Sequence, residues 1–411
     1  MSRRKVSFGN AFKPKIVRKD FLPVFIIVFN SLVWIPLAHG MFNSSINNLH
    51  VSADGILMLF AVHYVGIAGS AILGSIICPR ARKICFLLWI LAGTVMSALL
   101  TTIASNNTSV NILISFFLGI SIGIGLPSCL AYFADVTFVE NRGIYGGITW
   151  SAVGVGLLLL VLLINALNPV SAFLALAAWR GLGLITFFFF TKSRGKIQQK
   201  RNSSVYSSIL RRRDVILYLV PWIMFCFVNF MEAPILENLF GEFYIFVGFI
   251  EFALSGLFAL VGGILADLVG RKRVIITGFI VLGIEYAVLS LLSEMPVSWY
   301  IYTTLDGIAW GMFASVFFMT LWGDLAGEYQ KEKYYLIGGL PYLLIEVVSI
   351  FVKPYVGIIP LGTAFSLASF FLFLAVIPLM YAPETLPEKK IRERELREYI
   401  EKAKKIRKKH A

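Results

Sequence analysis

The chain has 411 residues, of which 58% are hydrophobic and only 15% are charged, and its formal net charge is +14. A soluble protein of this size has too much surface to cover with so few charges, which make up about 25% of an average soluble domain. Disordered chains are poor in apolar residues, so this composition excludes them as well.

Cysteines and histidines are dispersed along the chain. The four cysteines lie in apolar runs with no paired spacing, which argues against a disulfide scaffold: Cys78, Cys85, Cys129 and Cys226. The four histidines show no ligand spacing either, so we expect no metal site. A Gly-x-x-x-x-Gly-Lys-Ser/Thr run is missing from the sequence, and we expect no cofactor.

Twelve apolar runs are long enough to cross a membrane as helices, which takes about 20 residues. In chain order they cover about 21–41, 54–77, 84–104, 110–134, 144–167, 170–191, 215–236, 243–266, 274–293, 297–322, 335–357 and 360–381. Barrel strands are about half as long and alternate apolar with polar residues. We therefore expect an all-α integral membrane protein with twelve transmembrane helices.

Lysine and arginine are confined almost entirely to one set of connections. Of the 37, seven lie in 3–19, eight in 192–213, eleven in 389–409 and nine in the turns after even-numbered runs. This is the positive-inside pattern, which predicts a multi-pass protein of the cell membrane with both termini in the cytoplasm. The positive charge is then explained by topology and by attraction to membrane lipids, with no nucleic-acid partner.

The predicted spans divide six and six about a basic stretch. We expect a cytoplasmic N-terminal segment (1–20), a six-helix bundle (21–191), a basic cytoplasmic linker (192–213), a second six-helix bundle (214–382) and a basic cytoplasmic helical tail (383–411). The halves resemble each other at an offset of 189 residues. Gly74 and Arg82 correspond to Gly263 and Arg271, and Asp135 corresponds to Asp324, which indicates a duplicated unit.

Three motifs carry a resemblance to the major facilitator superfamily. Gly263-x-x-Ala-Asp267-x-x-Gly270-Arg271-Lys272 resembles its signature loop, Asp135 with Arg142 resembles the loop after its fourth helix, and Pro383-Glu384-Thr385 resembles the ending of its sugar porters. The resemblance implies two pseudo-symmetric six-helix bundles that rock about a central site.

The same resemblance implies that these loops are gates, formed by Gly263, Asp267, Gly270, Arg271, Lys272, Asp135 and Arg142. Asp267 lies near a helix end and can pair with Arg271 or with a neighbouring helix terminus. The first-half copy has Cys78 in the place of Asp267, so we expect the second-half copy to be the functional latch.

Ionisable residues inside spans are costly and therefore point to function. By analogy with the family's cavity-lining helices, Asp306, Glu346 and Glu251 can face the pathway and exchange protons, because desolvation disfavours a charged carboxylate. Structural hydrogen bonding is the alternative for each. Glu285, Arg180, His39 and His63 are expected to have structural roles, and Glu232 lies near the end of its span.

Helical spacing gives a candidate lining for a substrate site. Aromatic and polar residues recur on single faces of five spans: Asn30, Trp34, Ser128, Tyr132, Trp222, Asn229, Trp310 and Tyr342. Aromatic surfaces with a few polar groups are typical of small-solute sites. Ordinary packing is the alternative explanation for each residue.

We therefore expect a monomeric secondary active transporter, and not an enzyme, that moves a small organic solute by alternating access with protons. A uniporter or a drug/proton antiporter of the same fold is the nearest alternative. Two other classes remain open: a membrane sensor that has lost transport, and a membrane-embedded enzyme, although the dispersed histidines show no clustered acid–base set.

Overall fold

The computed structural model describes residues 21–49, 52–103, 107–189, 205–327 and 329–387. The predicted N-terminal segment, most of the predicted linker and the predicted tail helix lie outside these ranges. In the described part of the chain the regular structure is helical throughout, which confirms the all-α prediction.

The first half contains eight α-helices and three single turns. They are α1 (Phe21–Asn47), α2 (Ala53–Ile77), η2 (Cys78–Arg80), α3 (Arg82–Leu99), η3 (Leu100–Thr102), α4 (Thr108–Gly123), α5 (Leu126–Val136), α6 (Arg142–Asn165), α7 (Pro169–Leu182), η4 (Gly183–Ile185) and α8 (Thr186–Phe189). Side-chain caps begin several of them: Ser52 accepts from the N–H of Gly55, and Asn168 from that of Ser171.

The second half begins with the short α9 (Tyr206–Leu210). It continues with α10 (Arg213–Phe240), α11 (Phe243–Val269), α12 (Arg271–Leu292), α13 (Pro296–Phe313), the π-helical turn η5 (Ala314–Phe318), α14 (Leu321–Ala326), α15 (Lys331–Ile345), α16 (Val347–Val352), η6 (Lys353–Tyr355) and α17 (Leu361–Tyr381). Among the described residues, eleven helical segments are long and apolar enough to cross a membrane, and Pro169–Ile185 is a shorter apolar helix at the sixth predicted span.

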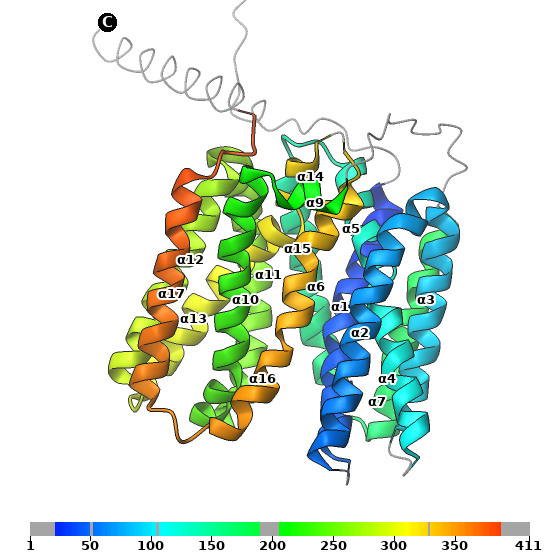
Figure 1. The fold of residues 1–411 in the computed structure, drawn as a ribbon, viewed down its shortest axis with the longest axis horizontal. Coiled ribbons are helices and arrows are strands. Elements are labelled where there is room, and N and C mark those ends of the chain that lie inside the picture. Colours follow the sequence, from blue (N-terminus) through cyan, green and yellow to red (C-terminus); the bar gives the residue numbers. More distant parts are fainter. Residues whose placement is uncertain (1–20, 50–51, 104–106, 190–204, 328, 388–411) are drawn as a thin grey trace, which may run out of the picture.

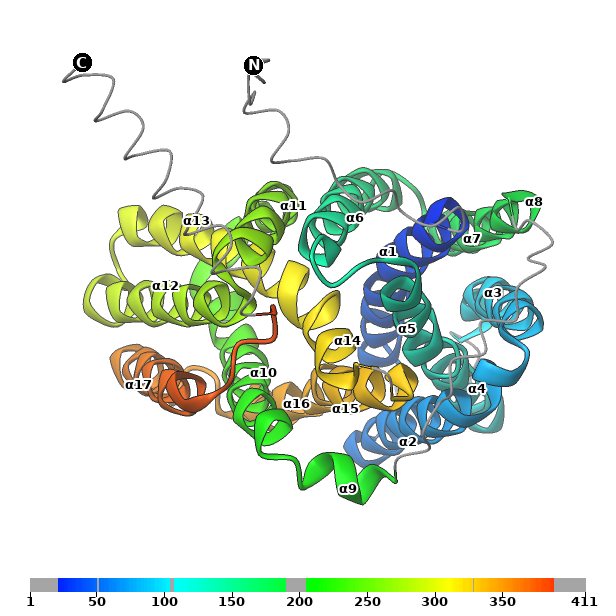
Figure 2. The ribbon, with the colours of Figure 1, turned by 90° about the horizontal axis from the view of Figure 1, so that it is seen from above.

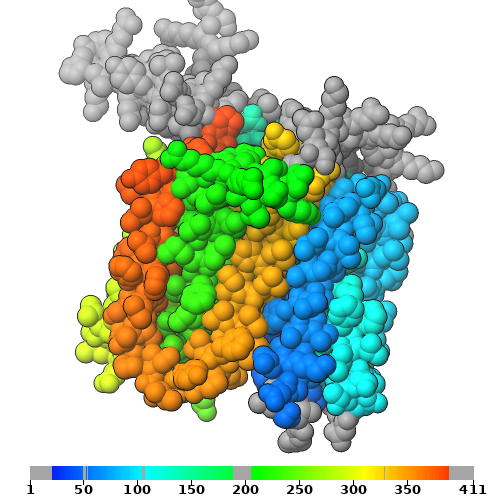
Figure 3. Space-filling view, in the orientation of Figure 1, coloured from blue at the N-terminus to red at the C-terminus, as the bar shows by residue number. Residues whose placement is uncertain are grey.

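The two halves stand side by side, with α1–α8 in one group and α10–α17 in the other (Figures 1 and 2). Glycines bring α6 and α11 together: a Cβ at Gly143 would lie 2.5 Å from the carbonyl oxygen of Gly263, and a Cβ at Gly154 would lie 2.7 Å from that of Phe252. On another face, α15 and α16 run between α10 and α2 (Figure 3). The α6–α11 pair is therefore tightly packed at the interface between the halves.

The two ends of the molecule differ in charge. We call the end formed by the connections near residues 78–82, 137–141, 211–212, 270 and 327–330 the basic end, and the opposite end the neutral end. The basic end is at the top of Figure 1, beside α9 and α14, and α16 lies near the neutral end. Lysine and arginine therefore gather where helices of both halves meet.

Four of the predicted continuous runs are interrupted. The fourth breaks at Gly125, just before Pro127, the sixth contains the η4 turn, the tenth contains the η5 turn, and the eleventh breaks at Glu346, which lies between α15 and α16. Proline removes a backbone donor, and a π-turn inserts a residue into the hydrogen-bond ladder. Such breaks free backbone groups and side chains at membrane depth, where they often mark functional sites.

Candidate functional site

At the basic end, two carboxylates of the second half bind the start of α6 in the first half. Asp324 on α14 pairs with Arg142 on α6 and with Nε of Arg271, 3.0 Å away. Asp267 lies 2.9 Å from Nη1 of Arg271 and accepts the backbone N–H groups of Gly143 (3.0 Å) and Ile144 (2.7 Å). Asp267 thus makes both contacts that its sequence position suggested. A carboxylate is stabilised at a helix N-terminus. Because Asp267 belongs to the second half and α6 to the first, these bonds hold the halves together.

A second set of ion pairs joins the first half to the start of α15. Lys331 Nζ lies 2.8 Å from Oδ1 of Asp135. Arg82 binds Oδ2 of Asp135 at 2.7 Å and Oε1 of Glu332 at 2.5 Å. Asp135 and Glu332 are buried, and the side chain of Arg82 is 17% exposed. Charges removed from water in this way depend on their partners. Lys331 with Asp135 and Arg82 with Glu332 cross between the halves and constrain the distance between them, whereas Arg82 with Asp135 lies within the first half.

The two sets are related by the repeat. The offset of 189 residues links five pairs of positions: Arg142 with Lys331, Asp135 with Asp324, Arg82 with Arg271, Cys78 with Asp267, and Gly143 with Glu332. In the second half, Asp267 supplies a carboxylate to Arg271. In the first half, where Cys78 replaces that aspartate, Glu332 from the opposite half supplies one to Arg82. Both copies of the loop therefore form links between the halves, whereas the sequence pointed to the second copy alone.

The end of the chain's last span supports the second-half loop. Gly270 has a φ of 108°, a left-handed conformation that suits glycine. Glu384 accepts the N–H groups of Arg271 (2.9 Å) and Lys272 (3.1 Å), which are the first residues of α12. Lys272 also donates through Nζ to the carbonyl oxygen of Met380 at 2.7 Å. The Pro-Glu-Thr motif thus caps α12 and orients Arg271 toward Asp324.

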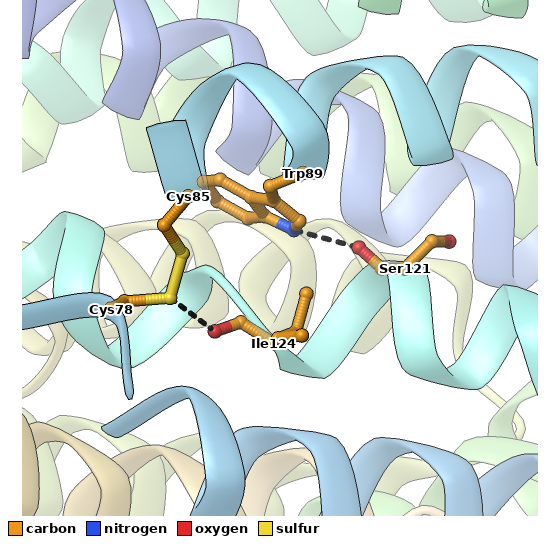
Figure 4. Close-up of a disulfide and its surroundings, with 5 residues drawn as sticks. All are labelled: Cys78, Cys85, Trp89, Ser121 and Ile124. Atoms are coloured by element: carbon orange, nitrogen blue, oxygen red, sulfur yellow. Dashed lines mark hydrogen bonds between the residues drawn. A yellow bond between two sulfur atoms is a disulfide. The ribbon is translucent and has the colours of Figure 1, made fainter. Parts of the chain in front are cut away.

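Two of the four cysteines come together at the first-half loop. Cys78 and Cys85 form a disulfide, seven residues apart in sequence, because η2 turns the chain back toward α3 (Figure 4). Beside it, Trp89 donates its indole N–H to the carbonyl oxygen of Ser121 at 2.7 Å (Figure 4). The turn that pairs the two cysteines cannot be deduced from their spacing. The bridge closes the loop that carries Arg82.

Near the neutral end, Glu346 joins the halves. Its Oε2 lies 3.0 Å from Nε2 of His39 on α1, and its Oε1 accepts the amide of Asn43 at 3.1 Å. His39 Nδ1 lies 3.0 Å from Nε2 of His63 on α2, and His63 Nδ1 lies 3.0 Å from the carbonyl oxygen of Ser115 on α4. Sequence reasoning placed Glu346 on the pathway but missed its partnership with the two histidines.

The other acidic residues of the spans gather inside the second half. The carboxyl groups of Glu251 (α11), Glu285 (α12) and Asp306 (α13) lie close enough to interact with one another. Glu285 and Asp306 are buried, Glu251 is half-buried, and Glu232 on α10 is buried as well. Asp306 and Glu251 are thus brought together as candidates for proton exchange, whereas Glu346 lies apart from them and Glu285 joins the group.

In the first half, the buried side chain of Arg180 contacts two of the predicted substrate residues. Arg180 donates to Oδ1 of Asn30 (2.9 Å) and lies against the rings of Trp34 and Trp89, 4.6 and 4.4 Å from their centroids. Trp34 is fully buried and donates to the hydroxyl of Ser97 at 2.7 Å. Both Asn30 and Trp34 therefore contribute to the packing of the first bundle.

Ser128 and Tyr132 lie on the broken fourth span. Ser128 is buried, and Tyr132 is half-buried, with its ring stacked on Phe86 and the guanidinium of Arg82 5.2 Å from its centroid. Tyr132 therefore lies beneath the ion pairs of the basic end.

The remaining predicted substrate residues lie in the second half, three of them in an aromatic cluster. Tyr342 packs against Trp222 (6.3 Å between centroids) and Trp310 (5.8 Å), and Trp222 donates to the carbonyl oxygen of Gly338. Trp150 of the first half reaches the same cluster through Phe318, 5.2 Å away. Trp150, Asn229, Trp310, Phe318 and Tyr342 are half-buried, which leaves part of each able to contact a solute.

Comparisons with known proteins identify the fold. No protein-family model and no curated protein matches the sequence. Among solved structures, a double-tryptophan mutant of XylE has a TM-score of 0.68 at 15% identity, covering 91% of this chain and 98% of that chain. The proton:xylose symporter XylE bound to 6-bromo-6-deoxy-D-glucose has a TM-score of 0.63 at 15% identity, covering 89% and 96%.

The human organic anion transporter MFSD10 (TETRAN) has a TM-score of 0.61 at 15% identity, covering 88% of this chain and 99% of that chain. Such likeness, over nearly the whole length of each chain, extends to both halves and to their arrangement. The chain therefore has the fold of major facilitator superfamily transporters.

Proposed function

We propose that the protein is a secondary transporter that moves a small organic solute across the cell membrane by alternating access, with protons as the coupling ion. The observation that carries the proposal is the reciprocal pairing at the basic end. Arg142 with Asp324 and Lys331 with Asp135 are related by the repeat, and each pair joins one half to the other. A gate of this kind closes one end while it is intact and opens that end when its ion pairs separate.

The half-buried aromatic residues supply the proposed solute contact. Trp150 from the first half and Trp310, Phe318 and Tyr342 from the second belong to one cluster, and Asn229 adds a polar group on the neighbouring α10. Sites for small solutes combine apolar and aromatic side chains with a few polar groups. The related folds support a solute of this size: XylE is named as a xylose symporter and MFSD10 as an organic anion transporter.

The proposed orientation places the basic end in the cytoplasm, in accord with the positive-inside rule. A cysteine at exposed Ser207 marks the basic end and one at exposed Asn47 marks the neutral end. The remaining free cysteines, Cys129 and Cys226, are buried. In intact cells, a membrane-impermeant maleimide should label Asn47→Cys and spare Ser207→Cys, and the reverse result would invert the orientation.

Transport is tested with purified protein reconstituted on a solid-supported membrane. Sugars, amino acids, carboxylates and amines are added with and without a pH step, and tracer uptake is measured in parallel, with protein-free liposomes as the control. A current on addition of a neutral solute that depends on the pH gradient supports proton coupling. Uptake that ignores the gradient supports a uniporter, and solute efflux driven by inward protons supports an antiporter.

The same experiment separates the other classes. A solute that raises the thermal midpoint of unfolding without any flux would support a sensor that has lost transport. Chemical conversion of the solute would support a membrane-embedded enzyme. The fold-sharing proteins named above are transporters, which favours the transporter proposal over both of these.

A further inference from the structure

The histidine–glutamate contact near the neutral end is the last link of a hydrogen-bonded chain through four helices. The chain runs from the Ser115 carbonyl oxygen on α4 to His63 on α2, to His39 on α1 and to Glu346 between α15 and α16, with each link at 3.0 Å. His63 is fully buried and His39 is 8% exposed, whereas the Glu346 side chain is 26% exposed. One end of this hydrogen-bonded series is thus sealed in the first half, and the other end is partly exposed.

Hydrogen bonding fixes how many protons the chain holds. A carbonyl oxygen only accepts, so His63 Nδ1 carries a hydrogen, and in neutral His63 the Nε2 atom accepts from His39 Nδ1. A neutral His39 then presents a lone pair at Nε2, and an ionised Glu346 presents only lone pairs at Oε2. The 3.0 Å contact between these atoms therefore requires one further proton, on Glu346 or on the two imidazoles.

Removal of that proton leaves two acceptors facing each other at one link. The links within the first half are buried, and an unpaired buried group costs the full desolvation penalty. The link at Glu346 is the most exposed, and Asn43 and water can bind the freed carboxylate. The break therefore falls at Glu346, which is the link that joins the two halves.

Other groups around the pair do not replace the proton. Tyr64 Oη lies 3.4 Å from His39 Nε2, and Tyr342 on α15 interacts with Glu346. A phenol O–H can donate to either group, but it places no hydrogen between His39 Nε2 and Glu346 Oε2. Asn43, from α1, is uncharged and donates to the other carboxylate oxygen. Because Glu346 lies at the break between α15 and α16, its carboxylate can leave His39 without moving the whole span.

We propose that His63, His39 and Glu346 form a proton-binding latch that holds the neutral end closed when it is protonated and releases it when the proton leaves. This inference rests on the proposed transport function for its purpose, but the latch itself can be measured without any solute. The cluster of carboxyl groups formed by Glu251, Glu285 and Asp306 lies within one half. Protonation of Glu346, by contrast, acts directly on a contact between the halves.

The test follows the width of the neutral end in the purified full-length protein. Donor and acceptor dyes are attached at Asn47→Cys on α1 and Tyr355→Cys on η6, both exposed positions. Energy transfer should fall as pH rises, because the closed latch holds one more proton than the open latch. A dye pair at Asn47→Cys and Asn165→Cys, both in the first half, should show no change.

Two variants are expected to act in opposite directions. In Glu346→Gln the amide donates to His39 Nε2 without an added proton, so energy transfer should stay high at every pH. In His39→Asn the series of hydrogen bonds from Ser115 to Glu346 is broken, so energy transfer should stay low. Each variant should change the closed-to-open ratio about fivefold or more, the effect of gaining or losing one hydrogen bond. Glu294→Gln, an exposed glutamate at the same end, is the matched control and should behave as the wild type.

Two results would overturn the latch: energy transfer that does not change with pH in the labelled protein without further substitutions, or a Glu346→Gln variant that keeps the pH dependence of the wild type. The transport proposal fails separately. A pH-dependent distance that is lost in Glu346→Gln, in a protein with no solute flux, keeps the latch and rejects transport. Proton-driven flux that is unchanged in Glu346→Gln keeps transport and rejects the latch.

Discussion

The two ends of the molecule are joined across the halves by different chemistry. At the basic end, Arg142 with Asp324, Arg82 with Glu332 and Lys331 with Asp135 are pairs of residues that ordinarily stay charged near neutral pH. At the neutral end, one carboxylate meets a histidine, the side chain whose charge changes most readily in that range. We call the three ion pairs of the basic end the lock. The lock and the proton-binding latch therefore lie at opposite ends of the bundle.

The difference shows how one fold can respond to protons at one end only. A change in pH near neutrality should act on the His39–Glu346 contact and leave the ion pairs of the basic end in place. Opening of the basic end then requires another source of free energy, which in the proposed cycle is the binding of solute. The comparison is tested in three ways. Carboxylates of the lock are removed, a carboxylate is added at position 78 to match Asp267 of the second half, and the Cys78–Cys85 disulfide is opened.

The largest effect is expected from Asp324→Asn. This change removes the shared partner of Arg142 and Arg271 and leaves two buried guanidinium groups without their common carboxylate. We expect a loss of about 3–5 kcal/mol in the free energy of unfolding. Basic-end opening should also rise, measured as faster maleimide labelling of a cysteine placed at Val136, which is 1% exposed.

Asp214→Asn is the matched control for that prediction. Asp214 pairs with Arg212 at the same end, but both side chains are about one quarter to one third exposed, at 26% and 33%. An exposed pair contributes about 0–1 kcal/mol, so labelling at Val136→Cys should remain at the wild-type rate. Equal effects of the two substitutions would mean that the basic end is held by packing and not by its buried ion pairs.

A medium effect is expected from Glu332→Gln, which removes one carboxylate from Arg82 and leaves Asp135 in place. We expect a loss of about 2–3 kcal/mol and a moderate increase in labelling at Val136→Cys. The repeat predicts a rescue: Cys78→Asp restores the carboxylate that Asp267 supplies at the equivalent position of the second half. The double variant should regain part of the lost stability.

Cys78→Ser combined with Glu332→Gln separates the new charge from the loss of the disulfide. Rescue by aspartate and not by serine would support the equivalence of the two loops. Rescue by neither would show that the first-half loop places position 78 differently from position 267.

The smallest effect is expected from the disulfide alone. Cys85→Ser opens a loop closed across a sequence separation of seven residues, and that closure is worth about 2.4 kcal/mol in the chain-entropy model. Thermal unfolding should shift by a few degrees, while labelling at Val136→Cys stays near the wild-type rate, because Arg82 keeps both acidic partners. A large rise in labelling would instead make the disulfide a necessary part of the lock.

Much of the fold could be predicted because each span is specified locally. The apolar runs near 54–77, 243–266 and 360–381 match helices within a few residues, since a membrane-length apolar segment must satisfy its backbone internally. The break at Glu346 was not predicted, because hydropathy does not report a local change of helix path. The Cys78–Cys85 disulfide was missed for a similar reason: it depends on the turn between two helices.

The candidate site was only partly accessible to sequence reasoning. Asp267, Arg271, Asp135 and Arg142 were found from their motifs, and the offset of 189 residues contained the signal for Lys331 as the counterpart of Arg142. Asn30 and Trp34 share a helix face, as expected, but that face packs against Arg180 in the first bundle. Periodicity identifies a face and does not identify the neighbour that the face will meet.

The sequence by itself determined the class of protein, the positions of the spans, the charge asymmetry of the two ends and the duplication of the halves. These properties follow from local hydrophobicity and from residue spacing. Only the tertiary structure decided which charges pair, because partners such as Asn43 and Glu346 are 303 residues apart and meet through the packing of two bundles. The lock and the latch are therefore properties of the interface between the halves, and neither half contains them alone.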